Sequence, residues 1–439
     1  MWTCTRRSHI PTIVKPKILS TLVGYDRRQF ASDAVAGVTV ALVALPLSIA
    51  IAIGSGAPPV AGLVTAAVAG FLISLLGGSR VQIGGPTGAF IVVVYAVIHR
   101  HGLAGLATAT MMAGALLLLA GFLRAGRLIR FIPDAVIEGF TLGIAVVIGI
   151  SQIRDLAGLQ TGPLDADFIP KIQGLWAARS SADPAAITLG LASIAALLLF
   201  RKWMPRFPAP LLVIAMASIA ALWMLPGIST VAARYGAIEN GVPPLQLPDL
   251  RLHTMIALLP SALTIALLAG IESLLSAIVA DRMIGSSHRS NAELIAQGAA
   301  NVVSPLFGGL PATGAIARTA TNVQAGGRTP MAGVIHALLI LIVLLVAAPL
   351  ANNLALPALA ALLMVTAWNM SEPHRWAERI ALPKSRLALL FGTAVLTVAV
   401  DLTAAIAIGT AAGLAMRYWD GRAAPGDWHT PQSRDNEDE

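Results

Sequence analysis

The sequence contains one short motif twice, as Gly84-Gly85-Pro86-Thr87-Gly88-Ala89-Phe90 and as Gly308-Gly309-Leu310-Pro311-Ala312-Thr313-Gly314-Ala315-Ile316. The tripeptide Thr-Gly-Ala occurs at residues 87–89 and again 226 residues later. Glycine allows the backbone to approach a neighbour closely, proline fits the first turn of a helix, and threonine supplies a hydroxyl donor. The motif therefore predicts two related helix starts in two halves of the chain.

Each motif opens an apolar segment of only about 11 to 15 residues, which at ~1.5 Å per residue covers roughly 17 to 22 Å of a ~30 Å hydrocarbon core. We interpret both as half-helices that begin near the middle of a membrane. The first backbone N–H groups of a helix are unpaired and carry about half a positive charge. Two such ends facing each other predict a binding site for an anion. The alternative is that glycine and proline only kink the helices or let them pack.

The rest of the sequence is a series of apolar stretches separated by polar or Pro/Gly-marked breaks. We place fourteen of them near residues 33–53, 57–76, 84–98, 102–122, 132–153, 185–201, 208–225, 256–280, 291–307, 311–324, 330–349, 350–370, 385–401 and 402–418. Because seven is odd, the second set of seven is inverted relative to the first, and the two motifs approach the midplane from opposite sides. The predicted fold class is an all-α membrane protein of about 14 transmembrane segments in a 7+7 inverted repeat, with two half-helices meeting at the midplane. Twelve or thirteen segments are the alternative.

The breaks divide the chain into five parts. These are a basic cytoplasmic N-terminal arm (1–32), a first repeat (33–225), an extracytoplasmic linker (226–255), a second repeat (256–418) and a short cytoplasmic tail (419–439). With both termini in the cytoplasm, 23 basic residues lie inside and 6 outside, the latter being Arg100, Arg154, Lys171, Arg179, Arg234 and Arg251. This asymmetry follows the positive-inside rule, so we place the chain in a bacterial inner membrane in that orientation.

Composition also favours lipid as the solvent. Of the 439 residues, 56% are hydrophobic and 12% are charged, and the mean hydropathy is +0.77. An ordinary soluble domain carries roughly a quarter charged residues. The net charge of +8 would suit nucleic acid, but only 5% of residues are aromatic and no basic cluster alternates with them, so we predict no nucleic-acid partner. An intramembrane enzyme would need a motif such as His-Glu-x-x-His, which is absent, so we expect no catalysis, no cofactor and no metal.

Two charged residues lie inside apolar segments, Glu272 in the eighth and Arg318 in the tenth. A charge at the membrane centre costs at least ~2.5 kcal/mol on insertion scales, so each needs a compensating group. Ser276 lies one turn after Glu272 on the same helix face. Arg318 lies one turn after Gly314, on the face of the predicted anion-binding end. Arg318 could attract the anion or form a structural ion pair with Glu272, and these two hypotheses are compatible.

These residues resemble the SulP anion transporters, a family of bacterial sulfate and bicarbonate permeases, plant sulfate symporters and animal exchangers related to pendrin and prestin. The resemblance covers roughly residues 30–418. It is strongest in Gly270-Ile-Glu-Ser-Leu-Leu-Ser-Ala-Ile-Val-Ala-Asp281, His288-Arg-Ser-Asn-Ala-Glu-Leu-Ile-Ala-Gln-Gly298, Ser304-Pro-Leu-Phe-Gly-Gly-Leu-Pro-Ala-Thr-Gly-Ala-Ile-Ala-Arg-Thr319 and Gly326-Gly-Arg-Thr-Pro330. The resemblance implies a core and a gate domain, with an anion held between the third and tenth helices.

The resemblance also implies roles for single residues. With Phe90 added as the end of the first motif, the anion-binding positions are Thr87, Gly88, Ala89, Phe90, Thr313, Gly314, Ala315 and Arg318. Glu272 and Ser276 match the acidic residue and the hydroxyl that are associated with cation coupling. Members similar to sodium-bicarbonate symporters have Asp in place of this Glu, which favours a proton over sodium. Most members continue into a cytoplasmic STAS domain, whereas only residues 419–439 follow here, so we expect none in this chain.

We therefore expect a secondary active transporter of small anions, sulfate before bicarbonate, that works by proton-coupled symport and alternating access. Its partners would be the anion, membrane lipid and a co-transported cation, and a homodimer remains open. The alternatives are a sodium-coupled bicarbonate symporter, an anion exchanger and an uncoupled anion pathway. A nucleobase carrier of the same fold would have a second acidic residue near the tenth helix start, and Leu310–Ala317 contains none.

Overall fold

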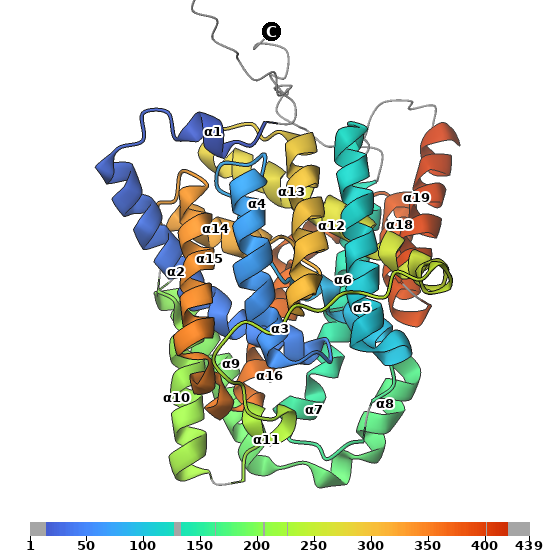
Figure 1. Cartoon of the computed structure of the whole chain (residues 1–439). Helices are drawn as coiled ribbons and strands as arrows, with labels where there is room; N and C mark the ends of the chain where they lie inside the picture. The colour runs from blue at the N-terminus through green and yellow to red at the C-terminus, as the bar shows by residue number, and fades with distance from the viewer. Residues whose placement is uncertain are drawn as a thin grey trace, which may run out of the picture.

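Long apolar helices stand side by side in the computed structural model (Figure 1). The structure describes residues 15–126, 133–162, 164–204, 207–225, 227–400 and 402–419. Six helical stretches within them are long and apolar enough to cross a membrane, namely Arg27–Gly54, Pro59–Leu76, Phe90–Phe122, Asp134–Leu156, Pro184–Trp203 and Leu252–Ile284. Large apolar side chains on outward faces, among them Met216, Ile219 and Trp223, are exposed. A surface of this kind is typical of a protein whose outer helices contact lipid.

In the first half, seven expected segments have helical counterparts. These are α2 (Arg27–Gly54); α3 (Pro59–Val64), η2 (Thr65–Ala69) and α4 (Gly70–Leu76) in one stretch; η3 (Gly88–Phe90) with α5 (Ile91–Phe122); α6 (Asp134–Ser151); α9 (Pro184–Trp203); and α10 (Ala209–Met224). Helix α5 contains two of the segments, because Gly102 has a positive φ of 68° and interrupts the helix. Shorter elements precede or follow these segments: α1 (Ile18–Thr21), α7 (Ile153–Leu156), α8 (Phe168–Ala177), η5 (Arg179–Ser181) and α11 (Val231–Tyr235).

The second half supplies the other seven segments. They are α12 (Leu252–Ile284), α13 (Ser290–Val303), α14 (Ile316–Gln324), α15 (Met331–Val346), α16 (Leu356–Met370), α18 (Lys384–Ala399) and α19 (Leu402–Trp419). The short elements here are η6 (Ser304–Phe307), η7 (Ala348–Asn353), η8 (Pro373–Arg375) and α17 (Trp376–Ile380). The tenth segment departs from the prediction, since its helix begins at Ile316 and not at 311. The residues before Ile316 are extended because they pair with the first motif.

The helices pack in two groups. In the core group (α2 to α5 and α12 to α15), α5 packs against α12 and α13, and α2 packs against α14 and α15. In the gate group (α6, α9, α10, α16, α18 and α19), α18 packs against α6 and α19, and α16 packs against α9. The two groups meet where α16 contacts α2 and η3. This contact brings the first motif to the boundary between the groups.

The two motifs meet as a pair of short antiparallel strands, β1 (Gly84–Gly85) and β2 (Thr313–Gly314). Gly84 lies opposite Gly314, and Gly85 lies opposite Thr313. Glycine is needed here because a Cβ on Gly84 would clash with Ile73, and one on Gly314 would clash with the Gln82 amide. The prediction that the two motifs face each other is therefore confirmed.

Candidate functional site

The first helix start leaves two backbone donors free. Thr87 has an extended backbone, η3 begins at Gly88, and no side chain caps this end. The Phe90 N–H already donates to the Thr87 carbonyl at 3.2 Å. The N–H groups of Gly88 and Ala89 come before it and are the unpaired donors expected at a helix N-terminus. Phe90 is 1% exposed and packs in the apolar core, so it forms part of the wall behind the site and donates nothing to a ligand.

The second helix start has the same construction. The Ala315 N–H donates to the Ile83 carbonyl at 2.8 Å, and the Thr319 N–H donates to the Ala315 carbonyl at 2.9 Å. The N–H groups between them, beginning at Ile316, form the first turn of α14, which also lacks a side-chain cap. Both helix dipoles place partial positive charge around the β1–β2 pair. Such an arrangement favours an anion there without any further group.

Both motif threonines use their hydroxyl protons inside the protein. The Thr87 hydroxyl donates to Glu272 Oε2 at 2.9 Å, and the Thr313 hydroxyl donates to the Ala269 carbonyl at 2.9 Å. Each hydroxyl has one proton, so neither threonine donates to an anion in this conformation. Their role here is to attach the motifs to α12. The Thr87 contact also brings the Glu272 carboxylate next to the first helix start, which the sequence did not predict.

Gly88 lies against the gate group. A Cβ built on Gly88 would be 3.2 Å from Met370 Sδ and 3.8 Å from Thr366 Cγ2 of α16, and 3.7 Å from Ile148 Cδ1 of α6. These neighbours come from the two gate helices that contact η3. A ligand on the Gly88 N–H would thus lie at the boundary between the core and gate groups.

We expect Gly88→Ala to fold and to bind its anion about tenfold more weakly, a difference of about 1.4 kcal/mol. The added methyl would displace the flexible end of Met370 and occupy space next to the free N–H groups. The concentration dependence of labelled anion uptake in proteoliposomes measures this. Gly149→Ala is the matched control, because a Cβ at Gly149 on α6 meets nothing within 4 Å. Equal affinities for the two variants would contradict the placement of the site.

Arg318 is a buried cation, 2% exposed, on the first turn of α14. Its Nη2 donates to the Ser48 hydroxyl at 3.1 Å, and its guanidinium lies against Gly85. Nε and Nη1 are buried and have no hydrogen-bond partner among the described residues. No carboxylate of those residues, Glu272 included, lies within ion-pair distance of Arg318. The hypothesis of a structural Glu272–Arg318 pair is therefore wrong for this structure.

Ser276 lies behind the site. It is fully buried, and its hydroxyl lies 3.3 Å from the Thr319 hydroxyl, which also accepts the Ile83 N–H at 3.1 Å. Ser276 therefore joins α12 to α14 and makes no hydrogen bond to Glu272. We propose that Ser276 takes part in cation coupling only when α12 and α14 move relative to each other.

Three polar residues that hold the second motif were not singled out from the sequence. The Thr65 hydroxyl accepts the Leu310 N–H at 2.7 Å. The Asn301 amide accepts the Ala312 N–H and donates to the Ala312 carbonyl, each at 2.8 Å. The Gln82 amide lies against Gly314 and donates to the Ser273 hydroxyl at 3.1 Å. In the sequence, each of them is a lone polar side chain in or beside an apolar segment. Such side chains are needed because the buried extended backbone has N–H and C=O groups that find no hydrogen-bond partner within a helix.

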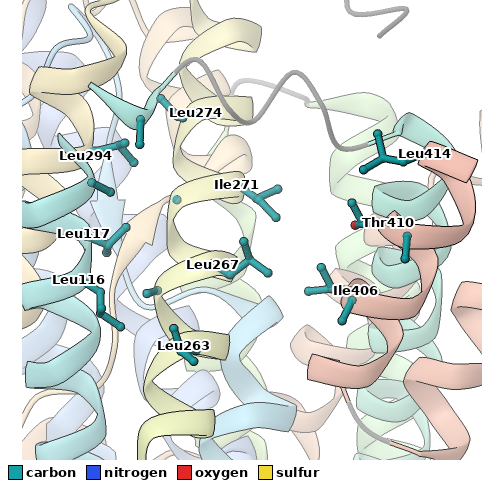
Figure 2. Close-up of a pocket in the computed structure, with 16 residues that line it drawn as sticks. Leu116, Leu117, Leu263, Leu267, Ile271, Leu274, Leu294, Ile406, Thr410 and Leu414 are labelled. Carbon is teal, nitrogen blue, oxygen red and sulfur yellow. The ribbon is translucent and has the colours of Figure 1, made fainter. Parts of the chain in front are cut away.

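A cavity of about 730 Å³ lies elsewhere, between α12 and α19 (Figure 2). Leucine and isoleucine side chains of α12 point into it from one side, and those of α19 from the other. Thr410 contributes a hydroxyl, and the other side chains that line it are apolar. An anion would lose its hydration there without gaining donors, so this cavity is not an anion site.

Comparison with known proteins agrees with this geometry. The sequence profile described as "Sulfate permease family" matches residues 30–415. The chain belongs to the sulfate permease family. YvdB of Bacillus subtilis (strain 168), named as a candidate sulfate transporter, is 43% identical over 396 residues, which are 90% of this chain and 74% of YvdB. The bicarbonate transporter BicA of Picosynechococcus sp. (strain ATCC 27264 / PCC 7002 / PR-6) is 33% identical, with 87% of this chain and 69% of BicA covered.

Two solved structures of anion transporters have the same fold. The transmembrane domain of a cyanobacterial BicA matches with a TM-score of 0.79 at 32% identity, covering 87% of this chain and 98% of that domain. The murine anion transporter Solute Carrier 26 family member A9, solved in the inward-facing state, matches with a TM-score of 0.83 at 18% identity and covers 95% of this chain and 74% of its own. At that identity the second match concerns the fold alone. The chain is therefore an integral membrane protein, and the predicted fold class of an inverted repeat is confirmed.

Proposed function

We propose that the protein is a secondary active transporter of small inorganic anions, with sulfate the first candidate substrate and bicarbonate the second. One observation carries the proposal: two uncapped helix starts and a buried guanidinium, which has no carboxylate partner among the described residues, gather around the β1–β2 pair. Free backbone donors and a charge-assisted donor suit an anion and reject a cation. The names of YvdB and BicA point to the same two substrates.

The position of the site supports alternating access. The helix starts belong to the core group, whereas Met370 and Ile148 next to Gly88 belong to the gate group. Movement of one group against the other would expose an anion at Gly88 to one side of the membrane and then to the other. Inverted-repeat transporters with half-helices at the midplane work in this way.

We assign the coupling of a proton to Glu272. Its carboxylate accepts the Thr87 hydroxyl next to the first helix start, and no cation of the described residues forms an ion pair with it. Protonated Glu272 would accompany the anion without adding negative charge. Ionised Glu272 would offset the positive charge of the empty site. Sodium is the alternative coupling ion, and it would need several oxygen ligands around the carboxylate.

The test is uptake of labelled sulfate and bicarbonate by proteoliposomes, with and without an inward proton gradient at fixed sodium, and then with sodium or the internal anion left out. We expect sulfate uptake that the proton gradient accelerates. A strict need for sodium would replace proton coupling by sodium symport. A strict need for anion inside would identify an exchanger, and current without a gradient response would identify an uncoupled pathway. Absence of any anion flux would contradict the proposed function.

We also propose that both termini are cytoplasmic in a bacterial inner membrane and that the chain forms a homodimer. The basic residues of the sequence support the orientation. A reporter that works only in the cytoplasm should therefore be active when it is fused after Glu439. A second reporter that works only outside should be active when it is inserted at Gly241, in the linker. The opposite pair of activities would reverse the orientation.

A further inference from the structure

A second cavity, of about 280 Å³, lies on the boundary between the core and gate groups. Its walls come from the start of α5, the end of α6, and from α7, α8 and α11. Figure 1 shows α7, α8 and α11 at the end of the helix bundle opposite α1. The polar residues that line it include Tyr95, His99, Gln152, Arg154, Lys171 and Tyr235. In contrast to the cavity between α12 and α19, this one offers donors to a small polar ligand.

Lys171 is a buried cation that lines this cavity. It is 5% exposed, and its ammonium lies 4.8 Å from the centre of the Tyr95 ring. Among the described residues it makes one hydrogen bond, a long one of 3.5 Å to the Ala166 carbonyl. Burial lowers the pKa of the ammonium, and the charges of Asp165 and Asp167 oppose that shift. Both carboxylates are exposed, and neither lies within ion-pair distance of the ammonium. An ammonium has three donors, so Lys171 retains donors for a ligand.

Arg154 adds a second cation to the same cavity. Its Nη2 makes a long contact of 3.4 Å to the Thr161 carbonyl, and its Nε is buried with no hydrogen-bond partner in the described parts of the chain. Asp155 also lines the cavity, but its carboxylate is bound by Arg234. The lining therefore has two cations and one carboxylate, and that carboxylate is already paired with Arg234. A small space with such an excess of positive charge favours an anion.

The cavity lies one helical turn from the Gly88 site. Ile148 of α6 faces Gly88, and Gln152, four residues later and directly after the end of α6, lines the cavity. On the other side, Ile91 follows η3 directly and also lines the cavity. Gln152 and Ile91 both approach Gly54, with Nε2 3.6 Å and Cδ1 3.5 Å from a Cβ built there. The cavity and the Gly88 site are thus neighbours along the same boundary.

We propose that this cavity is a second anion site, in which Lys171 and Arg154 hold a small inorganic anion before it reaches Gly88 or after it leaves. The proposal rests on the proposed transport function. The ligand class follows from the volume, which suits a sulfate, bicarbonate or halide ion, and from the two cations. The site concentrates anions at the end of the bundle where α8 lies, which we call the α8 face. It therefore sets the transporter's affinity for anions that are supplied on that face alone.

The test compares the two faces of the transporter in oriented proteoliposomes. With sulfate supplied on the α8 face, Lys171→Met should raise the half-saturating concentration about tenfold, which is the loss of one charge-assisted hydrogen bond. The maximal rate, and the half-saturating concentration on the opposite face, should stay unchanged. Lys171→Arg should restore the affinity, because it keeps the charge. An affinity on the α8 face that is unchanged in Lys171→Met would overturn the proposal.

Arg179→Gln is the matched control. Arg179 follows α8 on the same end of the bundle and is exposed, stacked 4.7 Å from the Trp176 ring. Its removal changes the charge of the surface by the same amount but leaves the cavity intact. An equal loss of affinity in Arg179→Gln would show that surface potential, and not the cavity, is responsible.

Sulfate binding to the purified protein separates this proposal from the proposed function. Sodium sulfate should raise the thermal unfolding midpoint of Arg318→Ala, whose Gly88 site is weakened, and should raise that of Arg318→Ala/Lys171→Met by less. If sulfate has these different effects on the two variants but the protein transports no anion, the second site is supported and the proposed function is contradicted. If transport is normal and sulfate raises the midpoint equally in the two variants, the second site alone is contradicted.

Discussion

Glu272→Gln removes the acceleration of anion uptake by an inward proton gradient while leaving the fold and anion binding in place. Glutamine has the shape and neutral charge of protonated glutamic acid, and its carbonyl oxygen still accepts the Thr87 hydroxyl. The side chain can then no longer release or take up a proton. We therefore expect equal uptake rates with and without the gradient. Labelled sulfate uptake at two external pH values, with internal pH held constant, measures the difference.

Glu293→Gln is the control for a buried carboxylate with a structural role. Glu293 is fully buried and accepts the N–H groups of Gly78 and Ser79 at 2.9 and 3.2 Å, and it also binds Ser273 and Gln297. An amide would direct its NH₂ group at one of these donors, at a loss of about 1–3 kcal/mol of stability. We expect less folded protein, with a normal gradient response in the surviving molecules. A full gradient response in Glu272→Gln would refute the assignment of proton coupling.

The sequence predicts the arrangement of helices well because apolar length and glycine position are local properties. The break between the third and fourth segments is an example, since Gly102 interrupts α5 at the predicted position. The meeting of the two motifs also follows from the sequence, because two matched motifs in an odd-numbered repeat must approach each other. The strand pair itself does not, since it depends on close contacts of Gly84 and Gly314 with side chains from other segments.

The direction of side chains is what the sequence leaves open. Helix periodicity places Arg318 on the face of the second motif, but its contact with Ser48 of α2 joins residues 270 apart in the chain. The same holds for Thr87, whose hydroxyl is used by Glu272 and not offered to a ligand. Lys171 and Arg154 read in the sequence as ordinary basic residues of outside loops. Only the folding of α8 towards α5 and α7 makes them the lining of one cavity.

Arg318→Ala should weaken anion binding by about tenfold to a hundredfold, which corresponds to the ~1.5–3 kcal/mol of a hydrogen bond to a charged group. The physical reason is the burial of a guanidinium that, within the part of the chain that the structure describes, has one hydroxyl partner and no carboxylate. Such a cation is poorly compensated in the empty protein, and an anion at the helix starts supplies the missing charge. The half-saturating concentration for uptake of labelled sulfate and its equilibrium dissociation constant are the two quantities to compare between Arg318→Ala and the unmodified protein.

Two further variants separate substrate binding from a structural role of Arg318. Arg318→Lys keeps the charge but loses the planar fork of donors, so it should bind with an affinity between those of the unmodified protein and Arg318→Ala. Ser48→Ala removes the one side chain that the guanidinium binds, so it should reduce affinity little if the anion is the main partner. If Arg318 only held helices together, Ser48→Ala and Arg318→Ala would both lower the amount of folded protein and leave the affinity of the remainder unchanged. A reduced affinity in well-folded Arg318→Ala, with near-normal Ser48→Ala, therefore assigns the guanidinium to the anion.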